Sequence, residues 1–140
     1  MKGRFFLDTN IFVYSFDRNA RAKAGRATEL IAQAVTSRKG IVSYQVVQEF
    51  LNVALKRFDR PMKTAEAEQY LTTVFRPLLS VHASQSLFID ALRLGARYKL
   101  SWYDSLIVAA AIEGQCSMLY TEDLQHGLHI GELIIANPFA

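Results

Sequence analysis

Short apolar runs alternate along this chain with longer segments whose apolar residues recur at helical spacing. The runs, typical of buried strands, cover 3–7, 41–42, 78–81, 118–120 and 133–136. The helical spacing covers 20–36, 43–57, 64–75, 84–95 and 101–114. Because the strands are apolar on both faces and alternate with helices, we predict an α/β fold. Its central, mainly parallel sheet has about five strands and is covered by helices on both faces.

Polar residues and one proline mark where these helices begin and end. Ser43, Thr64, Ser84 and Ser101 stand at the starts of helical patterns, where a hydroxyl can cap free backbone N–H groups. Pro77 follows the third pattern and is expected to stop that helix. The helix that begins after Ser101 is apolar on nearly every side, which predicts that it lies buried in the middle of the domain.

The chain has 140 residues, the length of one ordinary domain, so we expect a single domain over 1–140. Hydrophobic residues make up 51% and charged residues 21%, which argues against disorder. No apolar run approaches the ~20 residues that cross a bilayer. Asp8 interrupts the N-terminal run before a signal peptide could form, so we expect a cytoplasmic protein with no membrane partner. Cys116 is the single cysteine, which excludes an internal disulfide and predicts a buried, inert thiol.

Four of the 13 acidic residues stand against apolar segments or at the ends of predicted elements. Asp8 and Asp123 follow the first and fourth strands, and each has an ordinary explanation as a turn residue, or for Asp8 as a helix cap. Glu49 lies in the helix after the second strand; alone, it is better explained as a boundary residue paired with Lys56 or an arginine. Asp104 lies in the first turn of the buried helix, where a capping-box acid is also expected.

Together, the four acids predict a metal site. In a sheet of parallel strands, such positions converge on the edge formed by the carboxyl ends of the strands. Carboxylates within ~4–6 Å of one another raise each other's pKa and destabilise the fold, and no lysine or histidine adjoins them in the sequence. Oxygen ligands select a hard divalent ion, Mg²⁺ or Mn²⁺. Such an ion activates water for attack on a phosphodiester bond.

The acids and their polar neighbours have separate expected roles. Asp8 and Asp104 are expected to bind the ion directly. Glu49 and Asp123 are expected to bind it directly or through water, or to help deprotonate the attacking water. Glu122 is the alternative to Asp123 as the fourth acid. Side chains that could orient the carboxylates or the water are Thr9, Asn10, Ser43 and Thr121.

Two surface features bear on the partner. The net charge of +3 is compatible with a polyanion such as RNA. Arg93 and Arg97, one helical turn apart, could contact phosphates, although a solvated charged face explains each of them better. Trp102 and Tyr103 could stack on an unpaired base, but aromatic residues before a buried helix are more often core, and that explanation is favoured.

Four stretches carry these acids in a set order and spacing. They are Phe6-Leu7-Asp8-Thr9-Asn10-Ile11, Val46-Val47-Gln48-Glu49-Phe50, Trp102-Tyr103-Asp104-Ser105-Leu106-Ile107 and Leu119-Tyr120-Thr121-Glu122-Asp123-Leu124. They resemble the PIN domain, in particular the VapC-type toxins of toxin–antitoxin pairs. The resemblance spans nearly the whole chain and implies a three-layer α/β/α sandwich with Mg²⁺- or Mn²⁺-dependent endoribonuclease activity. It also implies a homodimer, a small antitoxin that blocks the acidic groove, and an acidic site made of Asp8, Glu49, Asp104 and Asp123.

Three other functions stay open at this point. A PIN nuclease with a housekeeping role in RNA processing would carry the same acids as a toxin. A phosphatase or phosphoacceptor domain would use an aspartate at a strand end, but it generally needs a lysine near the phosphate, and no lysine follows a predicted strand. A binding module with an inactive site is disfavoured because all four acids are present.

Overall fold

The computed structural model describes residues 3–140. Its strands are β1 (Arg4–Leu7), β2 (Gly40–Ser43), β3 (Leu79–Val81), β4 (Cys116–Tyr120), β5 (His129–Ile130) and β6 (Leu133–Ala136). Its helices are α1 (Thr9–Tyr14), α2 (Arg21–Ser37), α3 (Tyr44–Lys56), α4 (Thr64–Tyr70), α5 (Arg76–Leu78), α6 (Gln85–Tyr98) and α7 (Trp102–Glu113). A π-helical segment, η1 (Leu71–Phe75), joins α4 to α5.

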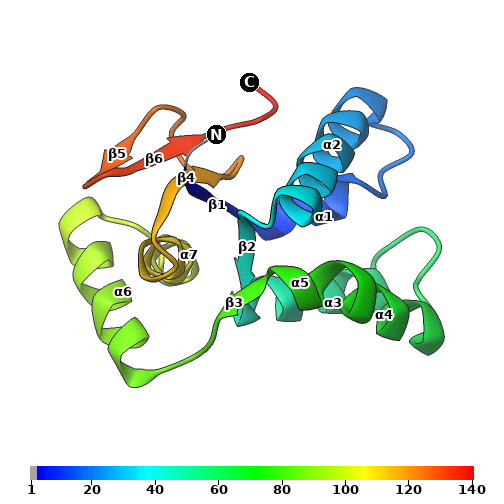
Figure 1. The fold of residues 1–140 in the computed structure, drawn as a ribbon, viewed down its shortest axis with the longest axis horizontal. Coiled ribbons are helices and arrows are strands. Elements are labelled where there is room, and N and C mark those ends of the chain that lie inside the picture. Colours follow the sequence, from blue (N-terminus) through cyan, green and yellow to red (C-terminus); the bar gives the residue numbers. More distant parts are fainter. Residues whose placement is uncertain (1–2) are drawn as a thin grey trace.

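The strands form one sheet in the order β3-β2-β1-β4-β6-β5, with β1 and β4 in the middle. All neighbours are parallel except β5, which runs antiparallel to β6. In Figure 1, α6 and α7 lie together on one side of the sheet, and α1 to α5 gather on the other. The predicted α/β class and mainly parallel central sheet are confirmed. Within residues 3–140 the sheet has six strands and not about five. The sequence pattern does not reveal β5, because its two residues are too few to show a period.

Two packed regions fix the helices that carry the acids. In α7, residues Ser105–Ala111 are all buried, which confirms the prediction of a helix in the middle of the domain. This burial fixes the first turn of α7 relative to the sheet. Between α1, α3 and η1, the rings of Phe12, Phe50 and Phe75 pack edge to face or tilted. The ring of Tyr70 stacks on Phe50 at 4.9 Å, and aromatic packing of this kind holds α1 and α3 together.

Two of the four predicted helix caps are confirmed and two are not. The hydroxyl of Ser84 accepts the N–H of Leu87 at 3.1 Å, and the hydroxyl of Ser101 accepts the N–H of Asp104 at 3.3 Å. Ser43 stands at the N-cap position of α3, but its hydroxyl makes no capping hydrogen bond. The side chain of Ser43 is instead fully buried beside the sheet.

Two expectations about helix ends differ from the structure, and one helix was not predicted. Thr64 is the first residue of α4 and not its cap; the cap is Lys63, whose N–H donates to Glu66 at 2.9 Å. Pro77 does not stop the helical path but lies inside α5, because proline is tolerated in a first turn, where no N–H donor is needed. Helix α1 begins directly after Asp8, and its six residues are too few to show a helical period.

Composition led to two further expectations. Cys116 is buried, as predicted, and burial raises the pKa of its thiol to about 12, which keeps it inert at neutral pH. Within residues 3–140, no helix is both long and apolar enough to cross a membrane. The cytoplasmic location and the single-domain organisation stay predictions.

Candidate acidic site

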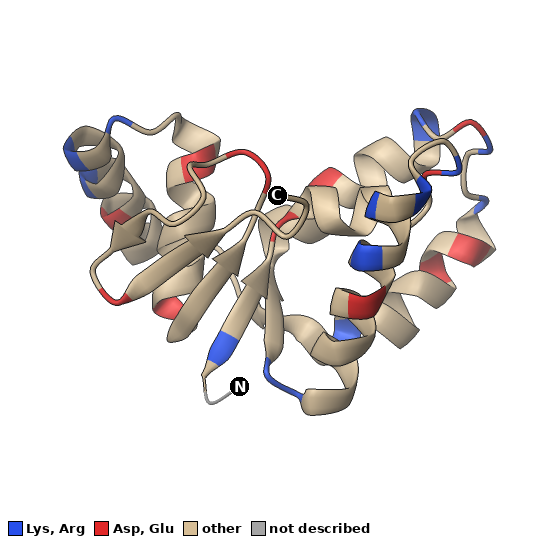
Figure 2. Ribbon diagram, turned by 90° about the horizontal axis from the view of Figure 1, so that it is seen from above, with Lys and Arg blue, Asp and Glu red and all other residues tan. Residues whose placement is uncertain are grey.

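The carboxyl ends of β1, β2 and β4 meet at one edge of the sheet. β1 pairs with both neighbours, and Leu7 lies opposite Tyr120. The N–H of Asp8 donates to the carbonyl of Tyr120 at 3.0 Å, so the pairing continues one residue past β1. Continuing the register of β1 with β2 puts Ser43 beside Asp8. Figure 2 shows acidic residues around this edge, where the arrowheads of the strands end.

Asp8 is the most buried of the predicted acids, with 5% of its surface exposed. It is the N-cap of α1, and its Oδ1 accepts the N–H of Thr9 at 2.7 Å. Its Oδ2 accepts the hydroxyl of Thr121 at 2.8 Å. Burial raises the pKa of Asp8 to about 7, against the lowering effect of these two hydrogen bonds, and the charges of Asp123 and Glu49 add to the rise. Asp8 is therefore both the helix cap and a member of an acidic cluster.

Glu49 is held between α1 and α7. Its Oε1 accepts a short hydrogen bond from the hydroxyl of Thr9. Its Oε2 accepts the side-chain amide of Gln45 at 3.2 Å, and the same amide nitrogen lies 3.3 Å from the carbonyl of Tyr103. Within residues 3–140, no basic group lies at ion-pair distance from Glu49. The ordinary explanation, a boundary glutamate paired with Lys56 or an arginine, is therefore wrong.

The charges of Asp104 and Asp123 act on one another at this edge of the sheet. Burial raises the pKa of Asp123, and the charge of Asp104 is the next cause, followed by those of Glu122 and Glu49. A hydrogen bond from the Asn10 side chain acts in the opposite direction. The N–H of Asp123 donates to the hydroxyl of Thr121 at 3.1 Å. Four carboxylates from distant parts of the sequence therefore act on one another here.

Glu122, the alternative to Asp123, has a different environment. Its Oε2 lies 2.6 Å from Nζ of Lys23, and its Oε1 accepts the hydroxyl of Tyr14 at 2.6 Å. These hydrogen bonds, with Lys23 first, lower the pKa of Glu122. The sequence offers no adjacent neutraliser for the acids, but the fold brings Lys23 from α2 to Glu122. Asp123 is thus the acid that is repelled by the other carboxylates of the cluster, whereas Glu122 forms an ion pair with Lys23.

A cavity of about 480 Å³ opens at this edge. Asp8, Glu49 and Asp123 line it, together with Asn10 and Glu122. Asp104 is not among the lining residues, and its carboxylate acts on the cavity through its charge on Asp123. The structure therefore brings three of the four predicted acids to one cavity and puts the fourth beside it.

The donor groups at this cavity suit a hard divalent ion, because all of them are oxygens. Two buried oxygens, Asn10 Oδ1 and Ser43 Oγ, have no hydrogen-bond partner within the described residues. An ionised, buried Asp8 is also costly without a cation nearby. In the part of the chain that the structure describes, no three carboxylates, imidazoles or thiols already stand as ligands of one ion. Water molecules or rotated acid side chains would therefore complete the coordination of a bound ion.

A family model of the PIN domain matches residues 5–127. The chain belongs to the PIN domain family. The resemblance seen in the four acidic stretches is thereby confirmed at the level of the family. No curated protein sequence matches this PIN domain.

Three solved structures are similar to this PIN domain. A toxin–antitoxin complex from Klebsiella pneumoniae has a TM-score of 0.63 and 21% identity, over 95% of this chain and 96% of that one. FitAB bound to an IR36 DNA fragment has a TM-score of 0.72 and 14% identity, over 97% and 96%. Mycobacterium tuberculosis VapC20, a Sarcin-Ricin loop cleaving toxin, has a TM-score of 0.62 and 22% identity, over 85% and 89%. At these identities, the likeness establishes the fold alone.

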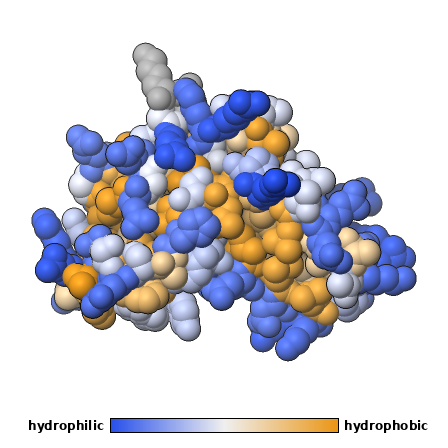
Figure 3. Space-filling model, turned by 60° about the horizontal axis from the view of Figure 1, so that its bottom comes forward, coloured by the Kyte–Doolittle hydropathy of each residue, from blue (hydrophilic) through white to orange (hydrophobic). Residues whose placement is uncertain are grey.

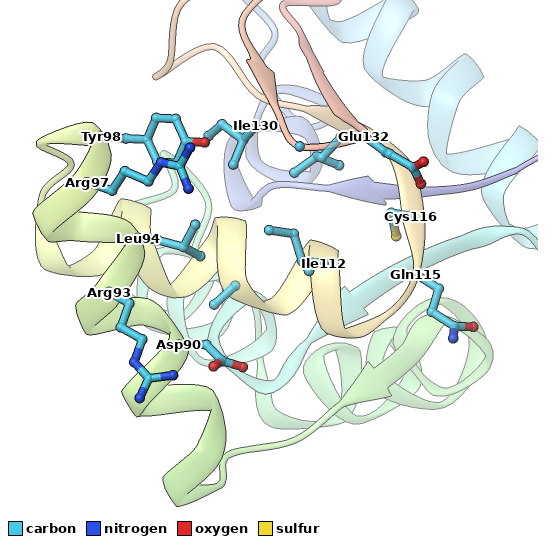
Figure 4. A pocket seen from close by; sticks show the side chains of 13 residues that line it. Asp90, Arg93, Leu94, Arg97, Tyr98, Ile112, Gln115, Cys116, Ile130 and Glu132 are labelled. Atoms are coloured by element: carbon cyan, nitrogen blue, oxygen red, sulfur yellow. The ribbon is translucent and has the colours of Figure 1, made fainter.

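A larger cavity of the PIN domain, about 780 Å³, lies between α6, α7 and the β5–β6 hairpin (Figure 4). Arg93 and Arg97 line it, beside Asp90. Cys116, the first residue of β4, also lines this cavity. Asp123 comes after the other end of β4, and the two ends of this strand are ~13 Å apart along the extended backbone. None of the four predicted acids lines this second cavity, and the suggestion that these arginines contact RNA phosphates stays a prediction.

The aromatic pair before the buried helix is exposed. Trp102 is 40% and Tyr103 is 64% exposed, so the favoured explanation that they belong to the core is wrong. The reason is that α7 is buried only from Ser105 onward, and its first turn emerges at the carboxyl edge of the sheet. Tyr103 therefore presents its ring to solvent one residue before Asp104.

Sequence reasoning did not find three of the residues that shape this site. Gln45 precedes Glu49 by four residues, a helical spacing that could have suggested their contact. Tyr14 and Lys23 are 108 and 99 residues from Glu122, and no local pattern links them. Asp8, Asp104 and Asp123 were found because they stand where an apolar segment starts or stops, and Glu49 because it lies beside the apolar residues of a predicted helix.

Proposed function

We propose that this PIN domain is an endoribonuclease that depends on Mg²⁺ or Mn²⁺ and acts as the toxin of a toxin–antitoxin pair. The observation that carries the proposal is the burial of Asp8 at an edge where the charges of Asp123 and Glu49 act on it. Several carboxylates so close together destabilise the fold unless a cation offsets their repulsion. A divalent ion bound by oxygen ligands offsets it, and phosphodiester hydrolysis is the chemistry such an ion supports.

The protein's own part is to hold the carboxylates in place. A bound ion would polarise the phosphodiester and lower the pKa of a water molecule. The N–H of Thr9 and the hydroxyl of Thr121 fix the two oxygens of Asp8, and the hydroxyl of Thr9 fixes Glu49. The carboxylates proposed to hold the ion, directly or through water, are Asp8, Asp104, Glu49 and Asp123. Glu49 and Asp123 are also the candidates to accept the proton of the attacking water.

An RNA substrate is supported by the surface next to the acids. The ring of Tyr103 is exposed, and this residue directly precedes Asp104. An exposed aromatic ring can stack on an unpaired base of any type. The backbone of Tyr103 is tied through Gln45 to Glu49, which fixes this ring segment relative to the carboxylates. Lys and Arg residues on the helices around the edge add positive charge for a phosphate backbone (Figure 2). Of the similar structures, VapC20 cleaves the Sarcin-Ricin loop, which supports RNA over DNA here.

The proposed partner is a small antitoxin that covers the acidic cavity. The similar structure from Klebsiella pneumoniae is a toxin–antitoxin complex, and it covers almost the whole of both chains. A protein laid over the cavity would exclude both the ion and the RNA. This arrangement gives a direct test, because the complex should be inactive until the antitoxin is removed.

A homodimer is also proposed. Figure 3 shows a band of hydrophobic surface across one face of the molecule, between polar margins. Helix α6 contributes three of the large exposed hydrophobic side chains, Phe88, Ile89 and Leu92, and Trp102 contacts Phe88 at 6.2 Å between ring centroids. Leu92 is 61% exposed, and apolar side chains grouped in this way are typical of a protein interface.

The decisive experiment is an Mn²⁺ titration of the purified full-length protein against structured and unpaired RNAs, with DNA of matched sequence as control. We expect cleavage of RNA that rises with Mn²⁺ and stops with a chelator. Intact RNA at every Mn²⁺ concentration would falsify the nuclease proposal. Induction of the wild-type protein in cells should arrest growth, whereas harmless overexpression of an active enzyme would favour housekeeping RNA processing.

No observation favours the phosphatase or phosphoacceptor alternative. Among the described residues, Lys23 is the lysine at ion-pair distance from one of these acids, and its ammonium group contacts Glu122 and Tyr14. The lysine that such a domain generally needs beside the phosphate is therefore already engaged in other contacts.

A further inference from the structure

We propose that Tyr14 and Lys23 are positioning residues: by holding Glu122, they fix the neighbouring Asp123 in the acidic cavity. The inference rests on the proposed function, since it concerns the binding of Mg²⁺ or Mn²⁺ at that cavity. It also assigns Glu122 a role as an anchor and not as a ligand.

The contacts around Glu122 form a closed set. Nζ of Lys23 lies 2.6 Å from Oε2 of Glu122 and 3.4 Å from the hydroxyl of Tyr14, which donates to Oε1 at 2.6 Å. Both oxygens of Glu122 are thus held, one by α2 and the other by α1. Each carboxylate oxygen of Glu122 therefore has a hydrogen-bond partner outside the other acids.

Aromatic rings fix the position of the cation. Nζ of Lys23 lies 4.5 Å from the ring centroid of Tyr14 and 5.5 Å from that of Phe139. The two rings pack edge to face at 5.1 Å. A cation placed against two ring faces is restrained in direction as well as in distance, so Lys23 holds Glu122 more firmly than a freely rotating lysine would.

The loop that carries Asp123 is therefore anchored at both neighbouring residues. On one side, the buried hydroxyl of Thr121 donates to Asp8 and accepts the N–H of Asp123. On the other side, Glu122 is held by Lys23 and Tyr14. Asp123 follows directly and lines the cavity with Asp8 and Glu49, and the Asn10 side chain hydrogen-bonds to its carboxylate. Its position depends as well on the backbone that Thr121 and Glu122 fix.

The pairing has a second consequence for charge. Glu122 adds to the repulsion felt by Asp123. The ammonium group of Lys23 offsets the charge of Glu122. Of the two neighbouring acids in the loop, Asp123 is thus the one without a paired cation within the described residues. Removal of the Lys23 charge would, by Coulomb attraction alone, strengthen the binding of a cation at the cavity. Positioning predicts the opposite, because a loosened loop no longer holds Asp123 in place.

The test compares Lys23→Met, Lys23→Arg, Tyr14→Phe and Glu122→Gln with the wild type, and Lys56→Met serves as a control for the loss of a lysine elsewhere. The first measurement is Mn²⁺ binding in the absence of RNA, from the electron paramagnetic resonance of free Mn²⁺. We expect Lys23→Met and Glu122→Gln to weaken Mn²⁺ binding by about 10-fold, and Tyr14→Phe to weaken it by less. Lys23→Arg keeps the positive charge and should bind Mn²⁺ as the wild type does. Since the pair is largely exposed, the Tm should change by less than about 3 °C in each variant.

The second measurement separates the role from substrate binding. Lys23→Met should lower kcat at limiting Mn²⁺ and leave the KM for RNA unchanged, and the Lys23→Met/Glu122→Gln double variant should be no worse than either single one. Unchanged or tighter Mn²⁺ binding in Lys23→Met would overturn the proposal, as would a rise confined to the KM for RNA. Loss of Mn²⁺ binding in Glu122→Gln alone would overturn it as well, by making Glu122 a ligand. A wild-type protein that neither binds Mn²⁺ nor cleaves RNA would instead refute the proposed function, and this inference with it.

Discussion

The hydroxyl of Thr121 donates a hydrogen bond of 2.8 Å to Oδ2 of Asp8, although 113 residues separate them in the sequence. Both residues directly follow neighbouring parallel strands, β1 and β4. The bond joins the two central strands at their carboxyl ends and fixes the orientation of the buried carboxylate. The chemistry proposed for this PIN domain depends on that orientation.

The first prediction concerns the proposed direct ligands. Asp8→Asn and Asp104→Asn should each lower RNA cleavage by at least about 100-fold, because an amide is a neutral and weaker ligand for a divalent ion. Initial rates on a fluorescent RNA at saturating Mn²⁺ measure the effect. Asp90→Asn is the matched control, since Asp90 lines the other cavity and should leave the rate unchanged. If either variant cleaves RNA at the wild-type rate, that aspartate is not part of the active site.

The second prediction concerns the cost of burying Asp8. Its pKa is about 7 in the folded protein against 3.8 as the ordinary value, so the folded state holds the proton more tightly. The metal-free protein should therefore lose stability as pH rises from about 4 to about 7. The loss is up to roughly 4 kcal/mol, because each pH unit between the two pKa values costs about 1.4 kcal/mol. Asp8→Asn carries no such charge and should be more stable than the wild type at pH 8, with the difference vanishing near pH 4.

Urea unfolding from pH 4 to pH 8 checks this, with Mn²⁺ as a second variable. Mn²⁺ should stabilise the wild type at pH 8, by about 2.7 kcal/mol at a concentration 100 times its Kd, and should not stabilise Asp8→Asn. A wild-type stability that stays flat or rises between pH 4 and pH 7 would contradict the proposed cost at Asp8.

The third prediction concerns the exposed ring of Tyr103. Tyr103→Ala should raise the KM for unpaired RNA by about 5- to 160-fold, since stacking on one base contributes about 1–3 kcal/mol. Because the ring is 64% exposed, the variant should unfold at nearly the wild-type urea concentration. Tyr103→Phe keeps the ring and should keep the affinity. Equal KM values for Ala and wild type would show that no base rests there.

The fourth prediction concerns the apolar face of α6. Leu92→Glu should convert the proposed dimer into a monomer, because a charge placed in an apolar interface must be desolvated on association. Leu55→Glu is the control, since Leu55 is also exposed, at 43%, but lies on α3. Light scattering after size exclusion measures both. A wild-type protein that is already monomeric at micromolar concentration would refute the dimer.

The sequence by itself determined the fold class and the identity of the acids. Apolar runs that alternate with helical spacing specify a mainly parallel sheet covered by helices, because both patterns are local and follow from the two backbone periods. The all-apolar pattern after Ser101 also specified that α7 is buried. Asp8, Asp104 and Asp123 were found where an apolar strand or helix starts or stops, and Glu49 was found beside the apolar residues of a helix.

Only the tertiary structure decided which partners those acids have. The separation of Asp123 from Glu122 rests on Lys23 and Tyr14, which α2 and α1 bring to the loop after β4. The contacts of Gln45, between Glu49 and the backbone of Tyr103, rest on how α3 meets α7. Hydrogen bonds and charges act through space, so adjacency along the chain does not reveal them, and their partners are set only when the helices pack on the sheet.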